Sequence, residues 1–221
     1  RWIDFSVNIG VTCVFDAGTP GCDAFHERVY GRLRDLDLQG ELPVYVDGCY
    51  VVTAPRQVDY AMEQLKRMRK EYNTDHLKVH TMKIFMDGTS KIHTAAMVTP
   101  YTDTGTTGVT AFNKEALADL LLRLNEEGLD LHLHTIGERA SRTVLDAVEK
   151  VRKDLGEKYR VKVTCAHLEI QDDADLDRFA KLGVTANFTP HWHAGCMSGN
   201  PYEVYCGFLG KERAGKMLRC K

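Results

Sequence analysis

Short runs of apolar and β-branched residues recur along the chain, separated by polar or turn-forming segments. They cover residues 11–15, 43–46, 79–86, 129–134, 161–167 and 184–189. Runs of this length and composition are typical of β-strands, and most of them end at a polar residue or a glycine-containing turn. The pattern therefore predicts six strands.

Longer segments between these runs repeat apolar residues every three or four positions, which is typical of amphipathic helices. They cover residues 58–72, 114–127, 138–155 and 172–182. Asn113 stands at the expected N-cap position of the second segment. Glycines follow three of the segments where a helix stop is expected, at Gly128, Gly156 and Gly183. On the last segment, Leu176, Phe179 and Ala180 share one face, which we expect to be buried.

The alternation of strands and helices predicts parallel βαβ units, which occur in a doubly wound sheet or in a (β/α)8 barrel. No G-x-G-x-x-G motif follows the first strand, so a dinucleotide-binding fold loses its main support. Barrel enzymes keep their chemistry at the carboxyl ends of the strands. Polar residues able to bind metals lie at those ends here: Asp16, Lys83, Asp87, His134, His167, His191 and His193. The sequence therefore favours an α/β fold of the (β/α)8 TIM-barrel type with about six βα units.

The segment of residues 88–113 has neither helical nor strand periodicity and contains three glycines. Loops of this length within a compact domain are often lids or binding loops. We therefore expect this segment to cover the mouth of the barrel. A flexible insertion without a role in binding is the alternative.

Composition narrows the class of protein. The chain of 221 residues has 29 Lys plus Arg and 31 Asp plus Glu, a net charge of −2, and 43% hydrophobic residues. This balance argues against a nucleic-acid partner, and no apolar run approaches the ~20 residues of a membrane span. The seven cysteines form no C-x-x-C pair. Without a secretory signal, they suggest reduced thiols in a cytoplasmic protein, although a disulfide stays possible.

Histidines close or follow several of the predicted strands. His132 and His134 form an H-x-H pair on one strand, and a strand's period of two points both side chains to the same face. His167 ends the next strand. Imidazoles that project from neighbouring strands can hold a first-row metal ion. His134 is the better ligand candidate because it is nearer the strand's carboxyl end; the alternative is one ligand and one core histidine.

Lys83 lies in a predicted strand whose other residues are largely apolar. A lysine buried in a barrel interior tends to lose its proton, because burial penalises the charged form. The neutral amine can react with carbon dioxide to give a carbamate, an anionic oxygen donor for metal ions. A lysine that faces solvent, or one paired with Asp87, is the alternative.

Four ordered segments resemble consecutive blocks of amidohydrolase family 3, the metal-dependent hydrolases that include N-substituted formamide deformylases. They are residues 83–89 (KIFMDGT), 134–140 (HTIGERA), 166–169 (AHLE) and 187–193 (NFTPHWH). The similarity runs in register across nearly the whole chain. Glu138 departs from the family pattern, which usually has aspartate at this position.

The resemblance implies a (β/α)8 barrel in which one or two zinc or similar divalent ions activate water to cleave a C–N bond. By position, it assigns Lys83 as a carboxylated lysine and His134 and His167 as metal ligands. Trp192, His193 and Thr89 are the expected substrate contacts, and Arg139 is a further candidate. The family's upstream H-x-H pair and its general-base aspartate have no counterpart here, so we expect both outside this chain.

We accordingly expect residues 1–221 to form a single, incomplete metal-dependent hydrolase barrel domain. Its expected partner is a small-molecule amide substrate, with neither nucleic acid nor membrane. An unclosed barrel exposes strand edges, which makes a homo-oligomer possible. The main alternative is a catalytically silent barrel fragment that binds a ligand or partner without chemistry. A phosphate-binding barrel enzyme is less well supported, because no glycine-rich phosphate loop occurs near the chain end.

For the 221-residue chain alone, we predict weak metal binding and no detectable hydrolysis. Three candidate ligands and an incomplete surrounding shell should lower affinity and activity by orders of magnitude. Metal analysis by mass spectrometry, together with an acyl-amide hydrolysis assay, measures both properties. Stoichiometric zinc with turnover would contradict the expectation that ligands and base lie outside this chain.

Overall fold

The computed structural model describes residues 2–18, 23–190 and 201–217. They divide into two compact units, residues 1–84 and 85–221, and each unit is described by itself. None of the described helices combines the length and hydrophobicity that a membrane crossing requires.

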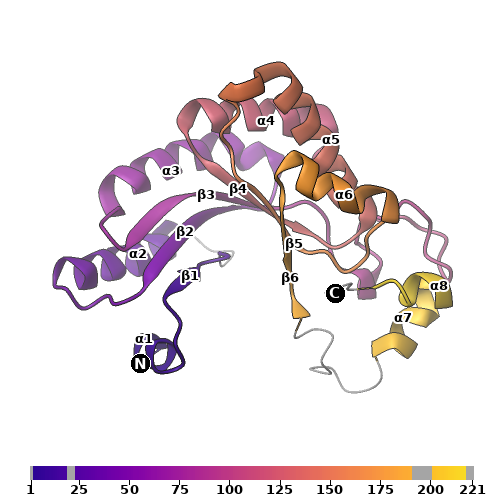
Figure 1. The fold of residues 1–221 in the computed structure, drawn as a ribbon, viewed down its shortest axis with the longest axis horizontal. Helices are drawn as coiled ribbons and strands as arrows, with labels where there is room; N and C mark the ends of the chain where they lie inside the picture. The colour runs from indigo at the N-terminus through magenta and orange to yellow at the C-terminus, as the bar shows by residue number, and fades with distance from the viewer. Residues whose placement is uncertain (1, 19–22, 191–200, 218–221) are drawn as a thin grey trace. The chain divides into compact units, whose positions relative to one another are not determined.

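The first unit alternates helices with parallel strands. Its elements are α1 (Trp2–Asn8), β1 (Cys13–Phe15), α2 (Asp23–Leu38), β2 (Tyr45–Val52), the 3-10 helix η1 (Pro55–Gln57), α3 (Val58–Tyr72) and β3 (Leu77–Phe85). β2 pairs in parallel with both β1 and β3. α3 packs on β2 and also contacts α2 (Figure 1). The unit is thus a run of βα units, as the alternating pattern predicts.

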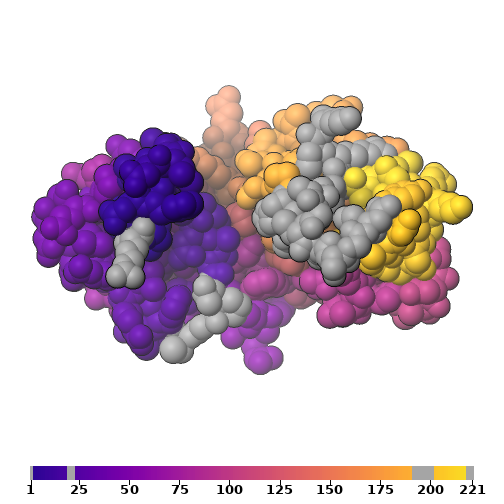
Figure 2. Space-filling view, turned by 90° about the horizontal axis from the view of Figure 1, so that it is seen from below, coloured from indigo at the N-terminus to yellow at the C-terminus, as the bar shows by residue number. Residues whose placement is uncertain are grey.

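Amphipathic periodicity explains how α3 packs. Its buried side chains recur every three or four residues: Val58, Ala61, Met62, Leu65, Met68 and Tyr72. They form one apolar face, whose removal from water stabilises the helix against the sheet. α1 differs, because it contributes no buried residue, and its Trp2 and Phe5 side chains are exposed. The N-terminal segment, in indigo, lies at the surface in Figure 2.

The second unit continues the alternation. Its elements are η2 (Ser90–Ile92), α4 (Lys114–Glu127), β4 (Asp130–Thr135), α5 (Glu138–Leu155), η3 (Gly156–Lys158), β5 (Val163–His167), α6 (Asp173–Leu182), β6 (Thr185–Phe188), α7 (Pro201–Leu209) and α8 (Lys211–Ala214). β5 pairs in parallel with both β4 and β6. α4 contacts α5, and α5 contacts α6 (Figure 1). Six parallel strands alternating with helices make this fold part of a (β/α)8 barrel, which confirms the predicted class.

Local capping sets the helix ends where the sequence predicts them. The Asn113 side chain accepts a hydrogen bond from the Ala116 backbone N–H at 2.8 Å, which satisfies a free donor of the first turn of α4. Gly128 and Gly183 end α4 and α6 in the left-handed conformation, with φ of 62° and 64°. Glycine adopts this conformation without steric cost.

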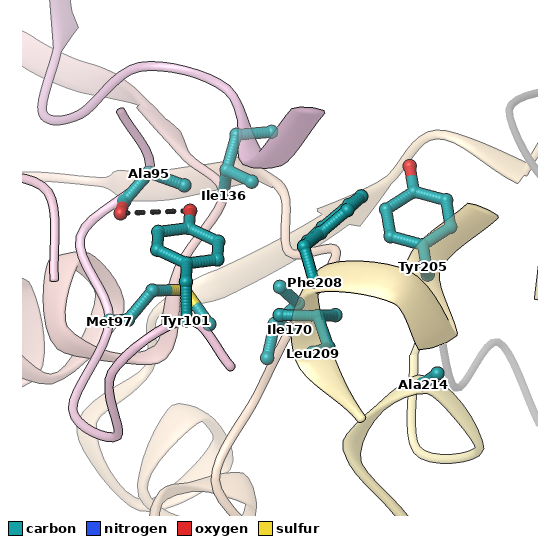
Figure 3. Close-up of a cluster of buried hydrophobic side chains, with 9 residues drawn as sticks. All are labelled: Ala95, Met97, Tyr101, Ile136, Ile170, Tyr205, Phe208, Leu209 and Ala214. Atoms are coloured by element: carbon teal, nitrogen blue, oxygen red, sulfur yellow. Dashed lines mark hydrogen bonds between the residues drawn. The ribbon is translucent and has the colours of Figure 1, made fainter. Parts of the chain in front are cut away.

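Residues 88–113 contain only η2, but part of the segment is firmly packed. Tyr101, Ala95 and Met97 are buried against α7 and α8, and the Tyr101 hydroxyl donates to the Ala95 carbonyl at 3.2 Å (Figure 3). The other members of this apolar cluster are Ile136, Ile170, Tyr205, Phe208, Leu209 and Ala214. A wholly flexible insertion is therefore wrong, while the lid role stays a prediction.

Three expectations from the sequence are corrected. The sequence pattern does not predict α1, α2, α7 or α8, and β2 runs to Val52 instead of ending at residue 46. Asp47 and Gly48 interrupt the apolar run, but the strand continues past them through an irregularity in pairing between Gly48 and Cys49. Leu176 is 37% exposed. Phe179 is buried, as predicted, but Ala180 is exposed, and α6 buries Asp175 beside Phe179. The Asp175 carboxylate pairs with the side chains of Arg142 and Arg178.

His26 on α2 is a buried histidine. Its ring stacks at 5.0 Å from Tyr50 and 6.1 Å from Tyr30. Within the part of the chain that the structure describes, neither ring nitrogen has a hydrogen-bond partner. Burial lowers the pKa of His26, and the nearby charges of Asp16 and Asp23 oppose this effect only in part.

We predict that His26→Phe raises the free energy of unfolding by about 1 kcal/mol at pH 7, because an apolar ring has no nitrogens to leave without partners. The gain should grow as the pH falls below about 6.5, where the unfolded chain binds a proton that the folded chain excludes. Urea denaturation between pH 5 and 8 measures both effects. His76→Phe is the control, since His76 is paired with Asp37 at 2.7 Å; an equal gain there would contradict the prediction.

Candidate metal centre

The structure places the predicted ligands on three strands. Lys83 lies in β3 of the first unit and is 3% exposed, so the solvent-facing alternative is wrong. His134 lies in β4 and His167 at the end of β5, both in the second unit. Thr89 is exposed in the loop after β3. Trp192 and His193, and with them His191, lie outside the described residues.

The imidazoles of His134 and His167 lie side by side. Their ring centroids are 4.6 Å apart, in an edge-to-face arrangement. Parallel pairing brings them together, because His134 is in register with Ala166, the residue before His167. The Phe85 ring lies 5.3 Å from that of His134, on an adjoining side. Two neighbouring strands thus supply two nitrogen donors at one edge.

Each of these rings is oriented by a hydrogen bond. His134 Nε2 lies 2.9 Å from the Gly88 carbonyl oxygen, which can only accept, so Nε2 carries the hydrogen and the lone pair of the neutral ring is on Nδ1. His167 Nδ1 lies 2.8 Å from the Thr189 hydroxyl oxygen. Histidine metal ligands commonly donate their other ring N–H to a backbone carbonyl in this way, which fixes the tautomer and the ring orientation.

The backbone is strained at the second histidine. His167 and Leu168 have φ of 78° and 52°, a region that costs side-chain-bearing residues about 1–3 kcal/mol each. The Leu168 N–H donates to the Thr135 carbonyl at 2.9 Å, and the Thr135 hydroxyl donates to the Ala166 carbonyl at 3.1 Å. These bonds to β4 hold the strained turn, and such strain commonly occurs at functional sites.

Asp87 ties together the loops beside the histidines. Its carboxylate accepts three backbone N–H groups: those of Ile136 at 3.0 Å, Gly137 at 2.9 Å and Ala96 at 2.9 Å. It thereby joins the end of β3, the long loop and the turn that follows His134. Burial raises the pKa of Asp87 to about 7, although the three N–H donors favour the charged form.

Two further buried acids hold neighbouring loops. Glu138 Oε1 accepts the backbone N–H groups of Val98 and Thr99 at 3.1 and 3.4 Å. The Ser90 hydroxyl donates to Glu169 at 2.6 Å, and the Tyr205 hydroxyl does so at 3.3 Å. Burial raises the pKa of both carboxyl groups. The side chain of Glu138 is thus used to fix the long loop.

The two candidate substrate contacts within the described chain also hold this loop. The guanidinium of Arg139 donates to the carbonyls of Thr107 and Gly108 at 2.9 and 2.6 Å. The Thr89 N–H donates to the Thr94 hydroxyl at 2.9 Å, and its carbonyl accepts from Thr94 and Ala95. Contact of either residue with substrate stays a prediction.

The histidine pair fits part of a divalent metal site. Two oriented imidazoles are suitable donors for zinc and related ions. Across residues 2–18, 23–190 and 201–217, no three His, Cys, Asp or Glu side chains come together to hold a metal ion. A complete site therefore needs a donor of another kind or from another part of the protein.

Sequence reasoning did not find Thr189 and Glu169. Thr189 is a polar residue directly after β6, and strand ends are where barrel chemistry is expected. Glu169 is an acid within an otherwise apolar stretch, a signal of a buried polar group with partners. The sequence therefore marks both residues as candidates, but it does not show which side chains they bind by hydrogen bonds.

A sequence model described as Amidohydrolase family matches residues 6–221. The chain is 28% identical over 187 residues to the exoenzymes regulatory protein AepA of Pectobacterium carotovorum, covering 84% of this chain and 38% of that protein. It is 30% identical over 197 residues to YtcJ of Bacillus subtilis, whose name assigns it to the amidohydrolases, covering 83% and 35%.

Two solved structures share the fold. An uncharacterized metal-dependent hydrolase from Pyrococcus furiosus matches with a TM-score of 0.72 at 22% identity, over 99% of this chain and 42% of that one. A Xaa-Pro dipeptidase with methionine in its active site matches with a TM-score of 0.55 at 16% identity, over 96% and 50%. The chain thus spans 35–38% of the length of these curated relatives and 42–50% of these solved structures.

We predict that Asp87→Asn lowers the free energy of unfolding by about 2–3 kcal/mol, because one oxygen becomes an NH2 group that faces a backbone donor. Urea denaturation measures the loss. Asp177→Asn on α6 is the matched control and should change stability by less than about 0.5 kcal/mol, since Asp177 is exposed. Equal stabilities of the two variants would contradict the role of Asp87.

The wild-type protein and the Asp87→Asn variant also test the pKa of Asp87. Its folded-state pKa of about 7 lies above the ordinary value of ~3.9, so the folded protein binds this proton more tightly than the unfolded chain. The stability of the wild-type protein should therefore fall as the pH rises from about 4 to about 7. Asp87→Asn should lack this contribution, and an unchanged pH slope would contradict the raised pKa.

Proposed function

Because the chain belongs to the amidohydrolase family, we propose that it forms part of a hydrolase that cleaves a non-peptide C–N bond of a small amide or formamide. The observation that carries the proposal is the oriented pair His134 and His167, at the carboxyl ends of adjacent parallel strands. Barrel enzymes place their reacting groups at these ends. The strained turn at His167 supports the same location.

His134 and His167 are the residues that would hold a divalent metal ion, zinc or a similar one. When bound, such an ion lowers the pKa of a water molecule and polarises the carbonyl of the amide. The Gly88 carbonyl keeps the lone pair of His134 on Nδ1, and the Thr189 hydroxyl orients His167. Asp87 keeps the turn after His134 in place.

Lys83 is the third ligand in this proposal. Its neutral amine attacks the carbon of carbon dioxide, and a proton is released as the N-carboxylate forms. The product carries one negative charge shared by two oxygen atoms, which would allow one or two ions to be bound. Burial of Lys83 supports this chemistry, since burial favours the neutral amine.

The substrate is proposed to lie against Thr89, Trp192 and His193. A general-base aspartate and an H-x-H pair would come from other parts of the protein. A peptide bond is the competing substrate class, because one solved structure with the same fold is a dipeptidase. Hydrolysis is therefore measured with small non-peptide amides and with dipeptides.

We place the protein in the cytoplasm, without nucleic-acid or membrane partners, and as a possible homo-oligomer. Cys13, Cys49 and Cys206 are free thiols, as a reducing compartment favours. The net charge of −2 fits a small uncharged substrate better than a polyanion.

A barrel module that binds a ligand without chemistry is the second candidate. The observation in its favour is that the described residues bring only two histidines together, with no third His, Cys, Asp or Glu side chain placed to hold a metal ion. It predicts no effect of chelator on any property of the protein.

The test combines metal binding with hydrolysis. In a cobalt titration of the 221-residue chain followed by absorbance, His134→Ala and His167→Ala should each weaken binding at least ~10-fold. His76→Ala is the control, because His76 is already paired with Asp37. The product of the whole reading frame should then hydrolyse small amides in preference to dipeptides and lose activity with chelator. Equal binding by all variants, or chelator-resistant activity, would overturn the proposal.

A further inference from the structure

Gly18, in the turn after β1, lies against the surroundings of Lys83. Its φ is +83°, and a Cβ at this position would lie 2.3 Å from Val51 Cγ2, 2.8 Å from Cys49 Sγ and 3.7 Å from Lys83 Cγ. Val51 is the β2 residue in register with Lys83. Gly18, Cys49 and Val51 therefore form a packed surface beside the aliphatic stem of Lys83, called the wall below. Any larger residue at position 18 would displace Val51 and Cys49.

Asp16 fixes the position of this glycine. Its Oδ1 accepts the Gly18 backbone N–H at 2.9 Å, and its Oδ2 accepts the Tyr30 hydroxyl at 2.9 Å. The Asp16 N–H donates to the Asp47 carbonyl at 2.8 Å, which extends the pairing of β1 with β2. The turn is thus held at its backbone and at its side chain.

Tyr30 connects this turn to the irregularity in β2. Its side chain is fully buried, and its hydroxyl accepts the Cys49 N–H at 2.8 Å and lies 2.9 Å from the Cys49 carbonyl. A Cβ on Gly48 would lie 2.7 Å from the Tyr30 ring, so glycine makes room for the ring at the point where the strand register shifts. Burial raises the pKa of Tyr30, which keeps the hydroxyl proton available for donation.

We propose that Tyr30 and Asp16 are positioning residues that seat Gly18 against Cys49 and Val51 and thereby fix the stem of Lys83. The proposal rests on the function proposed above, in which Lys83 is the modified ligand. A lysine side chain has four rotatable bonds and large rotamer entropy, so a rigid wall is needed to hold its amine at one place.

Trace reductive methylation with 13C-formaldehyde tests the proposal on the 221-residue chain. Mass spectrometry gives the labelling rate of Lys83 relative to the exposed Lys78 on the same strand. NMR gives the chemical shift of the methylated Lys83, which is assigned by its loss in Lys83→Arg. Neither readout needs a metal ion or a substrate.

Gly18→Ala is compared with Gly10→Ala. Gly10 has a φ of +82° but nothing within 4 Å of a built Cβ, so both variants carry the same backbone strain and only Gly18→Ala disturbs the wall. Tyr30→Phe is compared with Tyr45→Phe, whose ring is exposed. Asp16→Asn is the milder variant if Gly18→Ala does not fold, because one of its two side-chain bonds can persist.

We expect Gly18→Ala, Tyr30→Phe and Asp16→Asn to raise the relative labelling rate of Lys83 several-fold and to move its NMR signal, because the wall that buries the stem is loosened. The two controls should leave both readouts unchanged. Unchanged Lys83 labelling in folded variants, or an equal change in Gly10→Ala, would overturn the proposal. If the variants change the labelling rate and NMR signal of Lys83 as expected, but the protein neither binds metal nor hydrolyses amides, only the proposed function is rejected.

Discussion

The second unit depends on one buried carboxylate. Asp87 accepts three backbone N–H groups from two separate segments, residues 96 and 136–137. Aspartate is the smallest side chain with two carboxylate oxygens, so it can accept all three bonds in little space. Buried backbone donors without acceptors are costly, so this acceptor stabilises the approach of the long loop to the turn after β4. His134 lies two residues before that turn, and its place follows from the same bond set.

The second unit also contains a strained backbone segment that is held by hydrogen bonds. His167 and Leu168 hold an unfavourable backbone conformation, and hydrogen bonds to Thr135 secure it. Glu138 and Glu169 are buried acids that bind loop residues 90 and 98–99. The two histidine rings are themselves oriented by the Gly88 carbonyl and the Thr189 hydroxyl. Preorganisation of this kind is what a metal site requires, because ligands must be held in place before the ion binds.

In the first unit, a carboxylate likewise fixes a backbone turn, but different groups take part. Here the acceptor is Asp16, the donor is the hydroxyl of Tyr30, and glycines provide the close approaches at positions 18 and 48. His26 stacks on the same tyrosine without a hydrogen-bond partner among the described residues, so the region also contains an unused polar group. In the second unit the buried Asp87 accepts backbone N–H groups in the turn after the candidate ligand His134. In the first unit the half-buried Asp16 holds Gly18, which borders the candidate ligand Lys83.

The sequence by itself determined the alternation of strands and helices, the caps at Asn113, Gly128 and Gly183, and the residues worth testing as ligands. These features depend on periodicity and on contacts within a few residues, which a pattern can report. It failed at α2, at the continuation of β2 past Gly48 and at Leu176, where contacts with distant residues outweigh local preference. Only the tertiary structure decided that the rings of His134 and His167 meet, that His167 is strained, and that Gly18 borders Lys83. Each of these contacts joins segments tens of residues apart, and its geometry is set by strand register and backbone path, which no local pattern encodes.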